Sequence, residues 1–335
     1  MHRFTFFEKC GIISLYFLRG YEFMINLYLS FSVIFPIMVY LALGYILKCA
    51  KVIDAPSIRK MNGAIFKMFL PILLFLNVYN ADVSTAVNTK LIVFAISSIV
   101  IMFAVLMIVI PKIEKDHKKI SVMIQGIFRS NFVIFGLPVV ISLYGAENVG
   151  VTAVLIAFVT PVFNALAVVI LEIYSGNQVS FKKILKGIIK NPLIISSAIA
   201  LVFLAFGWRL PSLIEKTMTD ISKVATPLSL TLLGGTFTFS SIKGYIKQII
   251  IGVSGKLIIS PLIFLTCAIL LGFRNVELAS LVALYASPVA VSSYVMSQQM
   301  GGDETLASHY IVFGSICSIV TVFLFVFVLK QFAFI

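Results

Sequence analysis

Residues 129–138 read RSNFVIFGLP and stand inside an apolar block that runs from Ile120 to Tyr144. The block is long enough to cross the hydrocarbon core of a bilayer, which takes about 20 residues of helix. Pro138 removes a backbone donor and clashes with the preceding turn. In lipid, such a defect is tolerated only where protein or a water-filled cavity surrounds the backbone. The stretch therefore predicts a transmembrane helix that is broken inside the protein.

A second stretch, residues 286–293, has the same character: it reads ASPVAVSS and places Pro288 inside another apolar block. A further pair of intramembrane prolines, Pro71 and Pro227, has nearly the same separation in sequence as Pro138 and Pro288. This recurrence predicts two related halves. If each half holds an odd number of spans, the halves are antiparallel, which is the inverted-repeat pattern of secondary transporters.

The composition supports a membrane protein. Of the 335 residues, 60% are hydrophobic and 12% are charged, whereas soluble domains have about 45–50% apolar and about 25% charged residues. The net charge of +13 would also fit a nucleic-acid partner. However, the lysines stand in short loops between apolar blocks, where membrane topology explains them. We therefore expect a lipid bilayer as partner and no nucleic acid.

Ten apolar blocks follow one another between residues 26 and 329. Seven contain no Asp, Glu, Lys or Arg, and three contain one cation each. We predict an all-α, polytopic membrane protein of ten transmembrane helices in two inverted five-helix repeats, with the fourth and ninth helices broken and crossing. The blocks are Asn26–Leu47, Met61–Ala81, Leu91–Ile110, Ile120–Tyr144, Asn148–Leu171, Asn191–Trp208, Val224–Ile242, Gln248–Phe273, Leu278–Gly302 and Thr305–Leu329.

The domain boundaries follow from this pattern. The first repeat is expected at residues 24–176 and the second at residues 191–335, joined by a cytoplasmic central loop at residues 177–190. Residues 1–23 contain an apolar run that is too short to span a bilayer. We expect this extension either to be absent from the cellular protein, with Met24 as its start, or to form an interfacial helix.

The distribution of Lys and Arg predicts the orientation. The odd-numbered loops hold 14 of these residues, and the opposite side, with the termini, holds 8. Because positive charge concentrates on the cytoplasmic side, we expect the odd loops in the cytoplasm. Both termini then lie on the outer side of the cell (inner) membrane.

The residues around the two predicted breaks form a candidate binding site. Asn131 stands two turns before Pro138 and so shares a helix face with it, while Ser287 and Ser292 flank Pro288. If the breaks meet at the membrane midplane, converging helix ends can hold an anion there. The alternative is that these small polar residues only allow close helix packing.

Ionisable groups inside spans are functional candidates. Arg129 either guides an anion to the crossing or reaches the membrane interface. Lys256 is expected to pair with helix carbonyls rather than with a ligand. Asp220 forms either an ion pair with Lys223 or part of a cation or proton relay. Asn164 needs a partner in lipid, and we expect it to hydrogen-bond the broken helix.

Four segments resemble the auxin efflux carrier family of PIN-like transporters, whose bacterial members are often described as malate or malonate permeases. They are NFVIFGLP at 131–138, KNP at 190–192, ATPLSLTLLGG at 225–235 and ASPVAVSSY at 286–294. The resemblance extends from about Ile25 to Leu329. This chain lacks the long hydrophilic central loop of the plant long-loop carriers, which disfavours auxin itself as the substrate.

The resemblance implies ten helices in two inverted repeats. Helices 1, 2, 6 and 7 would form a scaffold, through which two chains pair as a homodimer, and helices 3–5 and 8–10 a transport domain that moves as an elevator. The broken helices would cross at Pro138 and Pro288, with Gly136 in the same break. The asparagine that binds the substrate carboxylate in the family corresponds to Asn131.

These observations predict a secondary transporter that moves a small organic anion, a mono- or dicarboxylate. The alternative is a channel or a membrane sensor without alternating access. The sequence has no Walker A motif and no catalytic constellation, and its cysteines and histidines are dispersed. We therefore expect no enzyme activity, no cofactor and no metal site.

Overall fold

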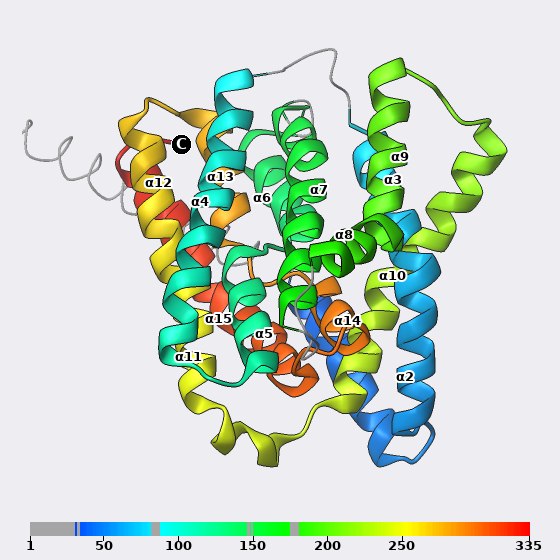
Figure 1. The fold of residues 1–335 in the computed structure, drawn as a ribbon. Coiled ribbons are helices and arrows are strands. Elements are labelled where there is room, and N and C mark those ends of the chain that lie inside the picture. Colours follow the sequence, from blue (N-terminus) through cyan, green and yellow to red (C-terminus); the bar gives the residue numbers. More distant parts are fainter. Residues whose placement is uncertain (1–30, 32–33, 82–87, 146–147, 149, 175–180) are drawn as a thin grey trace, which may run out of the picture.

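The structure, a computed structural model, describes residues 31, 34–81, 88–145, 148, 150–174 and 181–335. These residues form helices and their connections (Figure 1). The extension 1–23 and Met24 lie outside the described residues. The helices are Ile34–Cys49, α2 Ala55–Ala64, η1 Ile65–Phe69, α3 Leu70–Tyr79, α4 Thr89–Ile113, α5 His117–Phe128, α6 Phe132–Tyr144, α7 Gly150–Ile173, α8 Phe181–Lys190, α9 Pro192–Phe206, α10 Ser212–Thr236, η3 Phe239–Gly244, α11 Ile246–Ser254, η4 Gly255–Ile259, α12 Ser260–Leu270, α13 Asn275–Ala286, α14 Ser292–Gln299 and α15 Glu304–Gln331.

Several of these helices can cross a membrane. Within the described residues, five are long and apolar enough: α2–α3, α4, α7, α11–α12 and α15. A bent pair, α5 with α6, makes a sixth, and Ile34–Cys49, α9 and α13 are shorter apolar helices. The prediction of an all-α, polytopic membrane protein is confirmed. The count of ten spans stays a prediction.

The outer surface of the bundle is apolar. Only 28% of the most apolar window of α4 is buried inside the protein, and Val93, Ile101 and Ile108 of this helix are exposed. Leu262 and Leu270 of α12 are exposed as well. An exposed surface of this kind requires lipid as its solvent.

Short polar side chains define where the helices begin. Asp54 accepts from the backbone N–H of Ser57 at 2.9 Å, and Asn88 accepts from that of Leu91 at 3.1 Å. Such N-caps satisfy donors that have no partner within the helix. The polar turns that separate the apolar blocks in the sequence therefore also start the helices.

Helices in the two halves of the chain match in length. α5 and α13 have 12 residues each, and α4 and the α11–α12 span have 25 each. The α2–α3 span and α10 also have 25 residues each. In Figure 1, α4 descends while α11 and α12 rise, and α2–α3 rise while α10 descends.

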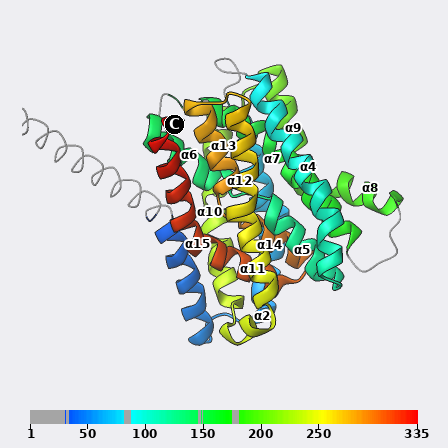
Figure 2. The same ribbon diagram turned by 90° about the vertical axis from the view of Figure 1, so that its left-hand side faces the viewer.

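The predicted central loop contains a helix. Within residues 177–190, α8 covers Phe181–Lys190 and lies across the other helices at the edge of the bundle (Figure 2). The sequence FKKILKGIIK places its four lysines on one helical face and its apolar residues on the other. This amphipathic pattern, rather than an apolar run, accounts for the additional helix.

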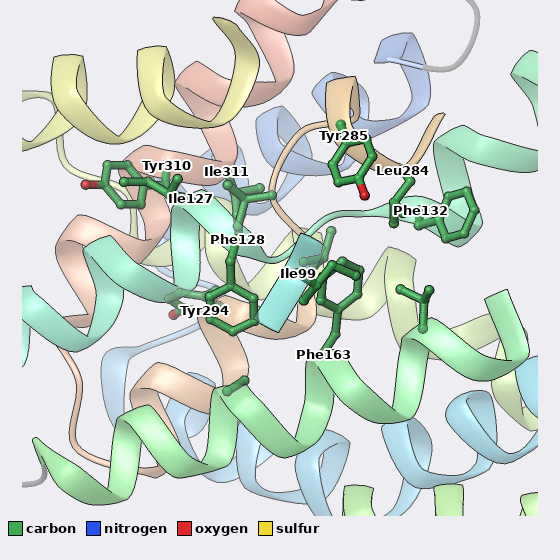
Figure 3. Close-up of a cluster of buried hydrophobic side chains, with 14 of the residues drawn as sticks. Ile99, Ile127, Phe128, Phe132, Phe163, Leu284, Tyr285, Tyr294, Tyr310 and Ile311 are labelled. Atoms are coloured by element: carbon green, nitrogen blue, oxygen red, sulfur yellow. The ribbon is translucent and has the colours of Figure 1, made fainter. Parts of the chain in front are cut away.

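The buried core surrounds the two interrupted helices. Phe128, the last residue of α5, packs edge-to-face on Phe103 with ring centroids 5.4 Å apart and lies 6.1 Å from Phe163 of α7. Figure 3 shows Phe128 and Phe163 in the same cluster as Tyr285 and Leu284 of α13. Close packing of these rings holds the chain next to the interruptions.

The first helix and α10 contact each other directly through their backbones. A Cβ atom on Gly44 would lie 1.7 Å from the carbonyl oxygen of Thr231, and one on Gly234 would lie 2.0 Å from that of Leu41. No real Cβ approaches an oxygen so closely, so only glycine fits at both positions.

Candidate functional site

The two interrupted helices meet at their breaks. The chain leaves the helical path at residues 129–131, between α5 and α6, and at residues 287–291, between α13 and α14. The backbone N–H of Asn131 donates to the carbonyl oxygen of Pro288 at 2.8 Å. The same N–H would otherwise bond within its own helix, so this contact explains why the helix stops there.

The fourth predicted span is interrupted at residues 129–131, in addition to the position next to the proline that the sequence suggested. Pro138 is inside α6, about two turns beyond the unwound residues. The chain also bends by 51° at a break between His117–Ile134 and Pro138–Tyr144, so the span is interrupted directly before Pro138 as well. At residues 129–131 the Pro288 carbonyl accepts from the Asn131 amide, and a sequence pattern does not show this partner.

A cavity of about 90 Å³ opens beside the two breaks. One wall belongs to α3 and α10, and the other to α7 and the unwound segments. The lining residues are Leu70, Leu73, Leu74, Asn77, Arg129, Ser130, Asn131, Phe132, Val133, Ile134, Thr160, Phe163, Asn164, Thr226, Ser229, Ala290, Val291 and Ser292.

Arg129 supplies the charge of this cavity. Its side chain is 3% exposed, and the guanidinium Nη2 donates to Asn164 Oδ1 at 2.7 Å and to Ser292 Oγ at 2.8 Å. Nη1 faces the sulfur of Met296. In the part of the chain that the structure describes, Arg129 forms no ion pair with a carboxylate. Its positive charge is therefore oriented by neutral groups and left without a counter-charge.

Further donors stand beside Arg129 without partners. Ser130 Oγ and Asn164 Nδ2 are buried and have no hydrogen-bond partner among the described residues. The side chain of Asn131 lines the cavity and does not cap the helix that it precedes. A buried polar group without a partner costs free energy, so these donors favour a ligand that accepts hydrogen bonds.

The sequence model of the membrane transport protein family matches residues 29–326, which is most of the chain. The chain belongs to the auxin efflux carrier family. Two relatives of this carrier bear the name uncharacterized transporter. One, from Methanothermobacter thermautotrophicus, is 24% identical over 87% of this chain and 96% of its own length. The other, from Methanocaldococcus jannaschii, is 24% identical over 79% of this chain and 87% of its own length.

Family membership confirms the resemblance in the sequence motifs and makes the protein a transporter in a lipid bilayer. A transporter family implies a transported small molecule, and it indicates a carrier rather than an enzyme. The apolar helices agree with a multi-pass membrane protein.

The other candidate residues of this auxin efflux carrier differ in their positions. Ser292 lines the cavity, and Pro288 contributes the carbonyl at the crossing. Ser287 instead donates to the carbonyl of Ala283 in its own helix and does not line the cavity. Gly136 lies in α6 at a position where the structure does not describe side chains.

The candidate charged and supporting residues also lie in different parts of the structure. Asn164 accepts from Arg129 of the broken helix, as expected. Lys256 is buried in η4, away from the cavity, and its Nζ has no partner among the described residues. The expected pairing with helix carbonyls is wrong. Asp220 forms the expected ion pair with Lys223 at 2.9 Å, in solvent-exposed positions outside the cavity.

The sequence analysis did not predict the polar residues of this carrier that line the cavity opposite the breaks. Asn77 of α3, Thr160 of α7, and Thr226 and Ser229 of α10 line the cavity. Thr226 and Ser229 belong to the segment ATPLSL, which carried part of the family resemblance. That segment was the available signal, whereas Asn77 is one polar residue in an apolar helix and gives none.

At one end of the bundle, a polar network joins α2 to α14 and α15. Gln298 accepts from Asn62 Nδ2 at 2.7 Å and donates to Glu304 at 2.7 Å. Arg59 of α2 also donates to Glu304, at 3.2 Å. Hydrogen bonds between α2 and the α14–α15 region therefore close this end of the carrier.

The opposite end of the bundle contains a second cavity next to the first. This second cavity, of about 170 Å³, shares Asn77 and Val133 with the first. It reaches Asn80 and Ala81 at the end of α3, and its lining is completed by Leu76, Ala153 and Ile156. The first cavity is therefore approached from the end of the bundle opposite the polar network.

Proposed function

We propose that this carrier is a secondary transporter of a small organic anion, a carboxylate, across the cell membrane by an elevator-type alternating-access mechanism. The observation that carries the proposal is the buried guanidinium of Arg129, which lines the cavity without a carboxylate partner. A buried charge without a counter-charge is costly. A bound anion removes that cost and so binds strongly.

The same geometry suggests how a carboxylate is recognised. Arg129 is held on one side by Asn164 and Ser292, which leaves the remaining donors of its planar fork for a ligand. Asn131, Ser130 and the Asn164 amide add neutral donors around the same space. In this proposal Arg129 neutralises the substrate, and Asn131 orients its carboxylate.

We infer that the transport domain comprises α4–α7 and α11–α15 and that the scaffold comprises Ile34–Cys49, α2–α3, α9 and α10. Inverted repeats at 24–176 and 191–335 are supported by the matched helix lengths and opposite directions of the two halves. The cavity lies between the two proposed bodies, where sliding of one body would expose it to either side. Pairing of two chains through the scaffold stays a prediction.

In this proposal the polar network of Asn62, Gln298 and Glu304 lies on the cytoplasmic side, which the distribution of loop charges supports. With both termini outside, the hollow at Asn80 and Ala81 faces outward. The structure then represents the outward-facing state of the proposed cycle. Opening to the cytoplasm requires the α2 contacts to break and the outer hollow to close.

The test is transport by the purified full-length carrier in proteoliposomes. We expect saturable uptake of a labelled carboxylate and accelerated exchange when the same solute is present on the other side, because alternating access couples the two directions. A channel would show flux without this counterflow, and a sensor would show no flux. Either result contradicts the proposal.

A pair of variants ties the flux to the site. Asn131→Ala should reduce uptake about tenfold or more, as expected when a hydrogen bond to a charged ligand is lost. Ser287→Ala is the matched control, because Ser287 bonds within its own helix. Wild-type uptake by Asn131→Ala would remove Asn131 from the site.

A further inference from the structure

A third cavity, of about 250 Å³, lies between the first helix (Ile34–Cys49), the end of α10, the start of η3 and α15. It shares no lining residue with the cavity beside the breaks. An apolar cavity stays dry and binds apolar ligands. The described lining of the third cavity is aliphatic, aromatic or glycine throughout: Met38, Leu41, Ala42, Tyr45, Gly234, Phe237, Phe239 and Val312.

The third cavity opens on the apolar outer surface of the bundle. Among its lining residues, Phe239 is 64% exposed and Tyr45 is 38% exposed. Ile46, which follows Tyr45, and Ile316 of α15, one turn beyond Val312, are exposed as well. Exposed apolar side chains of this kind face hydrocarbon in a membrane protein. The molecules that reach the cavity are therefore lipid chains and not water.

A basic side chain is fixed at the end of this cavity. Lys48 Nζ donates to the carbonyl oxygen of Phe237 at 3.2 Å, and Phe237 both ends α10 and lines the cavity. A lysine that caps a helix carbonyl in this way uses one of its three ammonium donors. Lys48 forms no ion pair with a carboxylate of the described residues. Its charge and two donors are thus available beside the apolar lining.

The two segments that meet at this end of the cavity are basic. Lys51, in the turn after the first helix, and Lys243, in η3, are both exposed. Figure 2 shows the first helix (blue) ending beside the segment that joins α10 to α11. Residues 34–53 and 237–250 contain no Asp or Glu that could offset the lysines. The loop charges predict that this end is cytoplasmic, where the leaflet carries anionic lipids.

We propose that the third cavity is a binding site for an anionic phospholipid, with an acyl chain in the cavity and the phosphate of the headgroup at Lys48. The two parts of the site match the two parts of such a lipid. The cavity takes the chain, and the ammonium group at its end takes the phosphate. The hydrogen bond from Lys48 to Phe237 holds the cation next to the lining. Occupation of this site does not depend on which solute the carrier transports.

Photo-crosslinking in vesicles tests the site. The full-length carrier is reconstituted in phosphatidylcholine vesicles with a trace of phosphatidylglycerol or phosphatidylcholine that carries a diazirine in its acyl chain. Peptide mass spectrometry then locates the adducts. We expect adducts at the lining residues Met38, Tyr45 and Phe239. Phosphatidylglycerol should give about fivefold more of them, the ratio that corresponds to about 1 kcal/mol of attraction to one lysine.

Two results of this experiment would overturn the proposal. Equal labelling of these residues by the two lipids would mean that only ordinary boundary lipid is present. Labelling elsewhere on the carrier but not at these residues is the result expected if a second copy of the chain covers the cavity.

Two pairs of variants assign the label to the cavity and to the charge. Ala42 is exposed and lines the cavity, so Ala42→Phe should fill it and remove most of these adducts. Leu43→Phe, at an exposed neighbour outside the lining, should not. Lys48→Gln keeps a donor for Phe237 and should bring phosphatidylglycerol labelling close to that of phosphatidylcholine. Lys112→Gln, in α4, should leave the ratio unchanged. Wild-type labelling of folded Ala42→Phe, or a wild-type ratio in folded Lys48→Gln, would contradict the proposed site.

Discussion

Arg129 and Lys256 are both buried cations of the proposed transport domain, and both lack a carboxylate partner in the described structure. Their surroundings differ. Arg129 donates to Asn164 and Ser292 and borders a cavity. Lys256 is 1% exposed in η4, and its Nζ has no hydrogen-bond partner among the described residues. Burial of a cation alone does not make a binding site; neutral groups that aim it at free space do.

The largest effect is expected at Arg129. Arg129→Gln keeps hydrogen-bonding groups but removes the charge, so transport should fall by about 100-fold or more, as for loss of one member of a buried charge pair. Arg129→Lys keeps the charge and loses the planar fork, and it should recover only part of the rate. Proteoliposome uptake measures both variants. Wild-type transport by folded Arg129→Gln would show that the charge of Arg129 is not needed for transport and that it does not differ from Lys256 in this respect.

Asn164→Ala tests the groups that aim the guanidinium. Asn164 Oδ1 accepts from Nη2 of Arg129 at 2.7 Å, and loss of a hydrogen bond to a charged group costs about 1.5–3 kcal/mol. We expect a weaker apparent affinity for the substrate, by about tenfold, with a smaller change in maximal rate. Asn164→Asp should be more severe, because its carboxylate would neutralise Arg129. Competition between unlabelled and labelled substrate measures the affinity.

Lys256→Met tests the second of the two buried cations. Methionine has a similar length and no charge, so the variant removes an unpartnered buried amine. Replacing a buried charge with a well-packed apolar group is often neutral or stabilising by about 1–4 kcal/mol. We expect a raised unfolding temperature in detergent and transport within about twofold of wild type. Loss of transport by a stable Lys256→Met protein would show that both cations serve the mechanism.

Arg59 extends the comparison to an exposed cation. It pairs with Glu304 at 3.2 Å, and the two side chains are 70% and 37% exposed. Exposed pairs contribute about 0–1 kcal/mol, so a double-mutant cycle with Arg59→Gln and Glu304→Gln should give a coupling free energy below about 1 kcal/mol. A larger coupling would show that the closed end of the interface depends on this pair.

The sequence allowed the membrane class and the region of the site to be predicted, for identifiable reasons. The apolar blocks exceed anything that a soluble core requires, and Asn131, Ser292 and Arg129 stand beside intramembrane prolines. The bend directly before Pro138 agrees with the predicted break, and the unwound residues 129–131 are an addition that the sequence did not indicate. At these residues the Asn131 amide donates to the Pro288 carbonyl, a partner that is distant in sequence and becomes known only from the fold.

The facing wall of the cavity could not be predicted for a related reason. Asn77 and Thr160 each give one polar position in a long apolar helix, and such positions are also common in simple packing contacts. Their role depends on which helix faces the crossing. Likewise, nothing in the segment around Lys256 distinguishes it from Arg129, because the difference lies in their tertiary neighbours.

The contact of Gly44 with Thr231 and of Gly234 with Leu41 bears on how freely this sequence can vary. Every L side chain is excluded at both glycines, although neither lines the site between the breaks. In a saturation-mutagenesis selection for properly folded carrier, these two positions should accept fewer substitutions than Arg129 does. The most restricted positions of the chain would then lie in the proposed scaffold, outside the cavity between the breaks.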